Sequence, residues 1–233
     1  ASYPSASLGD GQRSALDVQP GTVRVVMRKR PLFDHERAKG EFDVITCMGS
    51  GKVAVHETRL PRGVGYDGEL ESHEFTFSHA FDSLSTNDEV FQHSVRPLVN
   101  FALGGGQGTA FMFGQTGSGK TYTMGAMYER AASSCFPAAG PSSAASVATV
   151  TVSFIELVGD QGRDLLRQGE DGLPAPVKLL TDADGCVQLH GQLELAVQSA
   201  PALIDAIGAA LALRSSAATG VHDHSSRSHA VCR

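Results

Sequence analysis

Several features that would assign a chain to a particular class of protein are missing from this sequence. It contains no long apolar run, so we expect no helix that spans a membrane. Residues 1–10 lack the basic and apolar blocks of a signal peptide. No pair of cysteines has the spacing of a metal site or a redox motif, and we expect plain thiols in a reducing cytosol. The four cysteines are Cys47, Cys135, Cys186 and Cys232.

The sequence also lacks an excess of basic residues. Lysine and arginine number 19 against 25 aspartates and glutamates, which gives a formal net charge of −6. Because proteins that bind nucleic acids usually carry a basic excess, this balance argues against a nucleic-acid partner. Hydrophobic residues make up 41% of the chain and charged residues 19%, which favours one α/β domain with a packed core. We expect residues 1–20 to form a disordered leader and residues 21–233 to form that domain.

The most informative segment that is present runs from Gly114 to Thr121. It spells Gly-Gln-Thr-Gly-Ser-Gly-Lys-Thr, a complete Gly-x-x-x-x-Gly-Lys-Thr phosphate-binding loop. The apolar residues 109–113 before it predict a buried strand, and residues 122–124 after it can begin a helix. Glycines let backbone N–H groups approach a polyphosphate, and the helix N-terminus adds partial positive charge at the same place. In this pattern Lys120 reaches the β- and γ-phosphates, and the Thr121 hydroxyl coordinates Mg²⁺.

Hydrophobic periodicity and turn residues predict the remaining elements. A capping box of Thr86 and Glu89 predicts a helix that Pro97 kinks and that glycines 104–106 end. The expected strands are residues 23–28, 42–46, 53–56, 74–78 and 150–155, with a polar loop over 58–72. The other expected features are a helix over 127–136, a low-complexity linker over 137–144, a hairpin turn over 182–185 and a helix that Ser199 caps.

A second polar segment spans residues 221–229, with the sequence Val-His-Asp-His-Ser-Ser-Arg-Ser-His. Its chemistry suits a mobile segment that closes over a γ-phosphate. Ser225 and Ser226 could hold a water or a metal ion, and Arg227 could pair with a carboxylate. Taken alone, the same run is typical of a polar surface loop. A further alternative, without a cysteine or carboxylate at suitable spacing, is a metal site formed by His222, His224 and His229.

Taken together, the two segments resemble the kinesin motor domain family. Residues 114–124 match the family's loop, Gly-Gln-Thr-Gly-x-Gly-Lys-Thr-x-Thr-Met. Residues 222–229 match its first switch, Asn-x-x-Ser-Ser-Arg-Ser-His, except that His222 replaces the asparagine. Residues 28–31, Arg-Lys-Arg-Pro, are similar to the family motif that borders the adenine. The resemblance covers residues 22–233, and its other matches are Phe81-Asp82 with Val90-Phe91, and Phe154-Ile155-Glu156 with Asp164-Leu165-Leu166.

The resemblance implies a fold and an activity. The fold is α/β, a three-layer P-loop NTPase with a mixed central sheet and helices on both faces. The activity is that of a cytoplasmic motor ATPase that uses ATP or ADP with Mg²⁺ and binds tubulin in microtubules, without a nucleic-acid or membrane partner. The implied catalytic residues are Lys120, Ser225, Ser226 and Arg227, and the implied Mg²⁺ ligands are Thr121 and Ser226. The implied nucleotide contacts are Arg28, Arg30, Pro31, Gln115, Thr116, Gly117, Ser118, Gly119, Lys120, Thr121 and Tyr122.

Three departures from the family pattern qualify this interpretation. Residues 28–32 and 42–45 resemble the internal-motor (kinesin-13) class, whose members depolymerise microtubules, but residues 60–67 lack the Lys-Val-Asp tripeptide of that class. Val158-Gly159 replace the family's usual Tyr-Asn. His222 can donate and accept hydrogen bonds as asparagine does, but an imidazole titrates near pH 6.5, which predicts a pH-sensitive ATPase.

The family's second switch, Asp-Leu-Ala-Gly-Ser-Glu, has no counterpart in the sequence. We therefore expect a fold that is incomplete at its C-terminus, with exposed sheet edges that favour aggregation, domain swapping or a dimer. Two other functions stay open. A different P-loop ATPase or kinase would use Glu156 or Asp160 to hold Mg²⁺. A non-hydrolysing nucleotide-binding or microtubule-binding module would bind ADP without turnover.

Overall fold

The computed structural model describes residues 21–59, 69–136, 149–218 and 228–233. The chain divides into two compact units, Ala1–Ala110 and Phe111–Arg233. The predicted leader, the 137–144 linker and the loop at 60–67 lie outside the described residues, as does most of the first switch.

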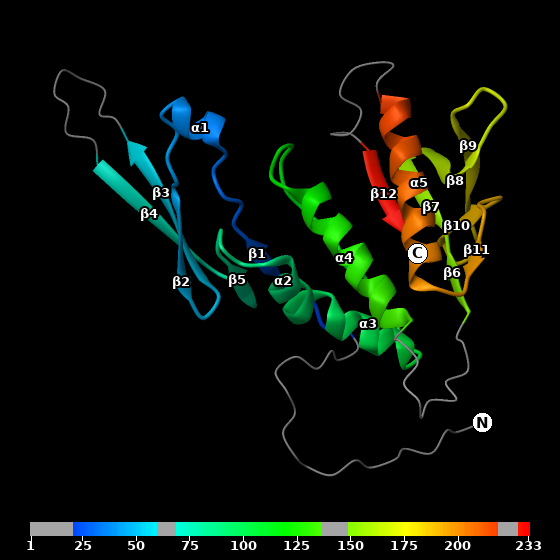
Figure 1. The fold of residues 1–233 in the computed structure, drawn as a ribbon, viewed down its shortest axis with the longest axis horizontal. Helices are drawn as coiled ribbons and strands as arrows, with labels where there is room; N and C mark the ends of the chain where they lie inside the picture. Colours follow the sequence, from blue (N-terminus) through cyan, green and yellow to red (C-terminus); the bar gives the residue numbers. More distant parts are fainter. Residues whose placement is uncertain (1–20, 60–68, 137–148, 219–227) are drawn as a thin grey trace, which may run out of the picture. The chain divides into compact units, whose positions relative to one another are not determined.

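The first unit contains a parallel pair of strands and a three-stranded antiparallel sheet (Figure 1). The parallel pair is β1 (Val26–Arg28) and β5 (His79–Phe81). The antiparallel sheet has the order β2 (Ile45–Gly49), β3 (Lys52–Arg59) and β4 (Glu69–Thr76). A short helix, α1 (Asp34–Ala38), follows β1. The prediction of a loop over 58–72 is partly wrong. Strand β3 extends to Arg59 and β4 begins at Glu69, and these two ends pair with each other.

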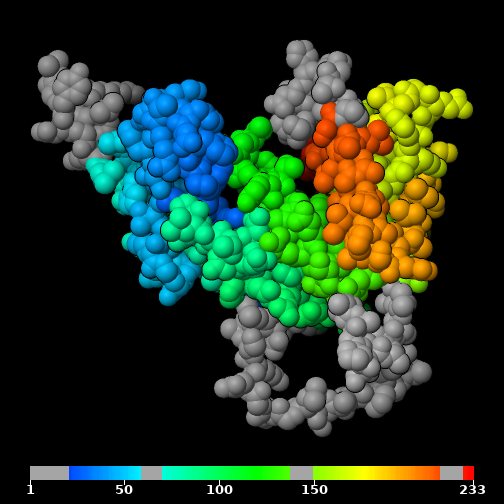
Figure 2. Space-filling view, viewed as in Figure 1, coloured from blue at the N-terminus to red at the C-terminus, as the bar shows by residue number. Residues whose placement is uncertain are grey.

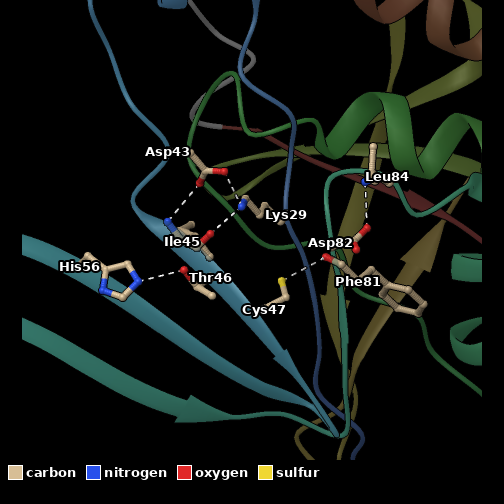
Figure 3. A network of polar contacts seen from close by, with 9 residues as sticks. All are labelled: Lys29, Asp43, Ile45, Thr46, Cys47, His56, Phe81, Asp82 and Leu84. Atoms are coloured by element: carbon tan, nitrogen blue, oxygen red, sulfur yellow. Dashed lines mark hydrogen bonds and ion pairs between the residues drawn. The ribbon is translucent and has the colours of Figure 1, made fainter.

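Lys29, the residue after β1, is bonded to residues at β2 and at β5 (Figure 3). Its Nζ lies 2.5 Å from the Asp43 carboxylate and donates to the Ile45 carbonyl, and its backbone N–H donates to the Phe81 carbonyl at 2.8 Å. Burial would by itself raise the pKa of Asp43, but hydrogen bonds from Lys29 and from the Ile45 N–H outweigh burial and lower that pKa. The basic segment after β1 is thereby fixed against β2 and β5.

Two helices complete the first unit, α2 (Asn87–Ser94) and α3 (Arg96–Leu103). The predicted capping box is confirmed: Thr86 Oγ1 accepts from the Glu89 N–H at 3.2 Å, and Glu89 Oε2 accepts from the Thr86 N–H at 2.7 Å. The predicted kink at Pro97 is a break between α2 and α3, with the proline in the first turn of α3.

The second unit contains two sheets and two long helices. The larger sheet has the order β10-β9-β8-β7-β12 and is antiparallel throughout. Its strands are β7 (Phe154–Val158), β8 (Gln161–Gln168), β9 (Pro174–Thr181), β10 (Val187–His190) and β12 (Ser228–Cys232). The smaller sheet pairs β6 (Val150–Val152) with β11 (Leu195–Val197). The helices are α4 (Lys120–Cys135) and α5 (Ala200–Ala218).

The core of the second unit lies between its helices and the face of the larger sheet that carries Phe154. Leu203 and Ile207, from the predicted apolar face of α5, are buried in one cluster with Phe154 and Leu165. In Figure 2 the atoms of α5 lie directly against those of the neighbouring strands. The other buried members of this cluster are Ala132, Val152, Val197 and Ala210.

Three predictions of individual elements are wrong. Residues 109–113 do not form a strand, and Phe111 and Phe113 are 74% and 92% exposed, because no strand in the described ranges pairs with them. The strand over 150–155 is divided, because Ser153 exchanges backbone hydrogen bonds of 2.9 Å with Arg233 and shifts the chain from the smaller sheet to the larger one. The helix over 127–136 is only the second part of α4, which begins at Lys120.

Candidate functional site

The backbone of residues 114–121 has the conformation that its glycines predict. Gly114, Gly117 and Gly119 have φ of 153°, 81° and 91°, values that side chains disfavour. The Ser118 N–H donates to the Gln115 carbonyl at 3.1 Å and closes the turn. A Cβ at Gly114 would lie 2.5 Å from Ser118 Oγ and 3.2 Å from Ser118 Cβ, at a φ that side chains disfavour, so the start of the loop favours glycine. The curve of the loop thus depends on its glycines.

Helix α4 begins directly at the end of the loop. Gly119 is its N-cap residue and provides no side chain to accept from the first N–H groups, and the first turn contains no acidic residue. The positive end of the helix dipole therefore faces the loop without an internal counter-charge. A phosphate group placed there would accept hydrogen bonds from the helix start and gain from the dipole.

Lys120 lies on the loop that precedes it. Its Nζ donates to the Gly114 carbonyl at 2.7 Å and to the Gln115 carbonyl at 2.9 Å. These two bonds fix the ammonium group over the curved backbone, where it would meet an incoming phosphate. Thr121 and Tyr122 follow in the first turn of α4, and both are exposed. The loop, the lysine and the hydroxyl of Thr121 form the core of the site.

Three of the residues predicted to contact adenine, Arg28, Arg30 and Pro31, belong to the first unit. Arg28 Nη2 donates to the Ser85 carbonyl at 3.3 Å. Arg30 donates to both Glu36 carboxylate oxygens, at 2.8 and 2.7 Å, and its guanidinium carbon lies 4.3 Å from the centre of the Phe33 ring. Hydrogen bonding to Arg30 lowers the pKa of Glu36 to about 2. The adenine pocket that would join Arg28, Arg30 and Pro31 to Tyr122 stays a prediction.

The predicted first switch is described only from Ser228 onward. Ser225, Ser226, Arg227 and His222 lie outside the described residues, so their roles stay predictions. Ser228 is the first residue of β12, which pairs with β7 along its whole length. Ser228 is therefore fixed to the larger sheet, in which β12 is the edge strand beside β7.

Sequence reasoning missed Arg214. This residue lies in α5, and its Nε donates to Glu156 Oε1 at 3.0 Å while its Nη2 donates to Ser228 Oγ at 2.9 Å. A lone arginine in the otherwise uncharged second half of α5 was the available signal, but its partners lie 58 and 14 residues away in sequence. Because Glu156 is buried and already paired, the structure gives no support to it as a metal ligand, and Asp160 lies exposed in the turn after β7.

Across residues 21–59, 69–136, 149–218 and 228–233, no group of three histidine, cysteine or acidic side chains is placed to hold a metal ion. Of the alternative histidine site, only His229 falls within these ranges, on β12. Within the same ranges no helix is long and apolar enough to cross a membrane.

A phosphate-binding loop occurs in several protein families, and comparison with known proteins shows which of them this chain belongs to. The sequence model of the kinesin motor domain matches residues 28–233, nearly the whole chain. The chain belongs to the kinesin motor domain family. A human kinesin-like protein, KIF24, is 35% identical over 215 residues, and the Arabidopsis thaliana kinesin-like protein KIN-13B is 35% identical over 211 residues. Each of these matches covers 90% of this chain, but only 15% of KIF24 and 29% of KIN-13B.

A solved kinesin structure matches the fold. The structure of a fast kinesin, described in relation to its ATPase mechanism and its interactions with microtubules, aligns with a TM-score of 0.70 at 28% identity. The alignment covers 91% of this chain and 58% of that kinesin. The predicted α/β fold of the kinesin type is therefore confirmed, and so is the resemblance to kinesins that include a member of the kinesin-13 class. The loop at 114–121 lies inside the matched region of this kinesin chain.

Proposed function

We propose that this chain is the nucleotide-binding portion of a microtubule motor ATPase that works in the cytoplasm on the microtubule cytoskeleton. The observation that carries the proposal is the loop of residues 114–121 in a kinesin family chain, with the Lys120 ammonium held over it at the N-terminus of α4. The substrate is ATP, and movement along microtubules or depolymerisation of their ends is the output.

The residues of the loop fit a nucleotide with Mg²⁺. The backbone N–H groups and the N-terminus of α4 bind phosphate oxygens, and Lys120 balances the charge that develops on the β–γ bridge. Thr121, whose side chain is exposed at the helix start, and Ser226 would hold Mg²⁺, which supplies further charge neutralisation when bound. Ser225 orients the attacking water, and Arg227 pairs with an acidic group of the motor.

The other implied nucleotide contacts belong to the same proposal. Gln115 to Gly119 present backbone N–H groups to the phosphates, and Tyr122 frames the adenine together with Arg28, Arg30 and Pro31. Among these, Arg30 has a fixed plane because Glu36 and Phe33 hold it, which suits stacking against a flat base.

The experiment compares Lys120→Ala with Lys178→Ala, which removes an exposed lysine from β9 in the same unit. Fluorescent ADP binding is measured on this chain, and ATPase rates are measured on the full-length protein with and without microtubules. We expect Lys120→Ala to lose binding and turnover, and Lys178→Ala to retain both. ADP binding without turnover in the native protein would favour a non-hydrolysing module, and turnover indifferent to microtubules would favour a different P-loop enzyme.

A further inference from the structure

Two histidines of the first unit, His79 and His93, stack on each other and are called the histidine stack below. His79 is the first residue of β5, and His93 lies near the end of α2. Their ring centres are 5.0 Å apart, and their planes differ by 7°. The ring of Phe81, two residues after His79 on the same side of β5, lies 4.4 Å from His79 and 6.3 Å from His93. The stack therefore joins α2 to β5.

The histidine stack lies beside buried residues of the first unit. Phe81 is 2% exposed, and Val90 and Phe91 of α2 are buried as well, whereas both imidazoles are half-buried. A neutral imidazole packs in such a place as a flat, uncharged ring. An imidazolium there loses part of its hydration. The contact between α2 and β5 therefore favours neutral rings.

The titratable groups on the elements around the histidine stack do not favour a proton on it. Arg24, before β1, acts on His79 as a like charge. Glu89 of α2 accepts two hydrogen bonds from the helix cap, at 2.7 and 3.0 Å, and Asp82 accepts two from the turn after β5, at 2.8 and 3.1 Å. On β2, burial raises the pKa of the Cys47 thiol, which keeps that group uncharged. Among the described residues, a proton on the stack thus meets a positive charge and carboxylates that are already engaged.

Protonation of His79 favours the separation of α2 from β5. Burial, then His93, then Arg24 lower the pKa of His79 in the folded protein. In a locally opened state the same ring is in water, with an ordinary pKa of about 6.5. Because the opened state holds the proton more tightly, opening becomes more favourable as the pH falls below about 6.5. Helix α2 has only eight residues, which suits local opening while the rest of the fold stays intact.

We propose that the histidine stack is a pH-sensitive switch, which holds α2 against β5 while both rings are neutral and releases α2 when His79 takes up a proton. The inference rests on contacts within the first unit alone, so it does not depend on the proposed ATPase function. Since one proton is taken up, the equilibrium constant for opening α2 should rise by up to about tenfold per pH unit below 6.5.

The test is amide hydrogen exchange on the full-length protein between pH 7.5 and pH 5.5, corrected for the intrinsic rates. In the original protein, opening of α2 should rise by about three- to tenfold over this range, while α4 in the second unit stays nearly constant. His79→Phe keeps a flat ring against His93 and removes the proton site, so most of the pH dependence should disappear. His93→Phe should reduce it. His73→Phe is the matched control, because His73 lies on β4, 3.7 Å from Glu57 and outside the stack, and this variant should behave as the original.

The pH profile of the original protein decides the inference even where a variant fails to fold. Protection of α2 at pH 7.5 should be the same in all four proteins, which shows that the phenylalanine variants are folded. A change of less than about twofold in the opening of α2 between pH 7.5 and pH 5.5 in the original protein would overturn the inference. An equal rise in α4 would indicate general acid unfolding and overturn it as well. The same result follows if folded His79→Phe keeps the full pH dependence, or if His73→Phe loses it.

Discussion

Single residues carry the candidate site, and most of them were accessible from the sequence. The glycines and Lys120 occupy the positions that the phosphate-loop pattern predicts, because loop conformation depends on local backbone freedom. Asp164, in contrast, was noted only as part of a family motif. It is fully buried and accepts from the N–H groups of Leu166 and Leu193, at 2.9 and 2.6 Å. Its second partner lies 29 residues away, which no local pattern shows.

The first prediction concerns Gly114. In Gly114→Ala the new methyl group meets Ser118 Oγ at 2.5 Å, and a φ of 153° is unfavourable for alanine. We expect the loop to open and ADP to bind at least about tenfold more weakly, a loss of about 1.4 kcal/mol. Fluorescent ADP titration measures this change.

Gly125→Ala is the matched control, because Gly125 lies inside α4 and a Cβ there meets nothing within 4 Å. Alanine at this position should leave ADP affinity unchanged and stabilise the fold by about 0.5–1 kcal/mol. Equal ADP affinity in both variants would show that the curve of the loop at Gly114 does not matter for binding.

At the scale of elements, helices were easier to predict than strands. A helix satisfies its hydrogen bonds within its own sequence, so the capping box before α2 and the cap before α5 were sufficient signals. A strand makes its hydrogen bonds to another strand, and the local sequence does not show which strand that is. Residues 109–113 have the composition of a buried strand but no partner in the described ranges, and 150–155 divides where its partners change.

The capping box gives the second prediction. Thr86→Ala removes the acceptor for the Glu89 N–H and one donor to the Glu89 carboxylate. We expect a loss of about 0.5–2 kcal/mol in the free energy of unfolding. Urea denaturation followed by circular dichroism provides the measurement.

Ser133→Ala is the comparison variant, since the Ser133 hydroxyl donates only to the Glu129 carbonyl one turn earlier in α4. That change should stay within about 0.5 kcal/mol of the original stability. A loss from Thr86→Ala no larger than this would mean that the cap does not hold α2 in place.

On the scale of the whole molecule, the lowered carboxyl pKa values are concentrated in the first unit. Hydrogen bonding to Arg30 lowers the pKa of Glu36 to about 2, and the pKa of Asp82 is lowered chiefly by the N–H of Leu84. Asp43 also has a lowered pKa, as described above. Burial, with the neighbouring His93 and Arg24, lowers the pKa of His79.

The third prediction follows from the sign of these shifts. A carboxyl with a lowered pKa stabilises the folded state above its unfolded pKa of about 4, and that contribution is lost as the pH falls through the folded value. His79 acts in the same direction from about pH 6.5 downward, because the unfolded state takes up the proton first. We expect the first unit to lose stability between pH 6.5 and pH 2 faster than the second.

Amide hydrogen exchange at pH 6 and pH 3, corrected for the intrinsic rates, measures this difference for each unit separately. Glu36→Gln removes one titrating group and should flatten the pH dependence of the first unit below pH 4.5, the ordinary pKa of that carboxyl. Equal acid sensitivity in both units would contradict the assignment of these shifts.

The position of Lys120 has a consequence for the thermodynamics of nucleotide capture. Its ammonium group is already immobilised by the carbonyls of Gly114 and Gln115, so the entropy of ordering that side chain is lost during folding and not during binding. Ordering a long side chain on association typically costs about 0.5–1.5 kcal/mol. When a phosphate binds, its oxygens replace backbone carbonyls as the acceptors of the Lys120 ammonium group, which itself stays in place. The loop is therefore preorganised for its ligand.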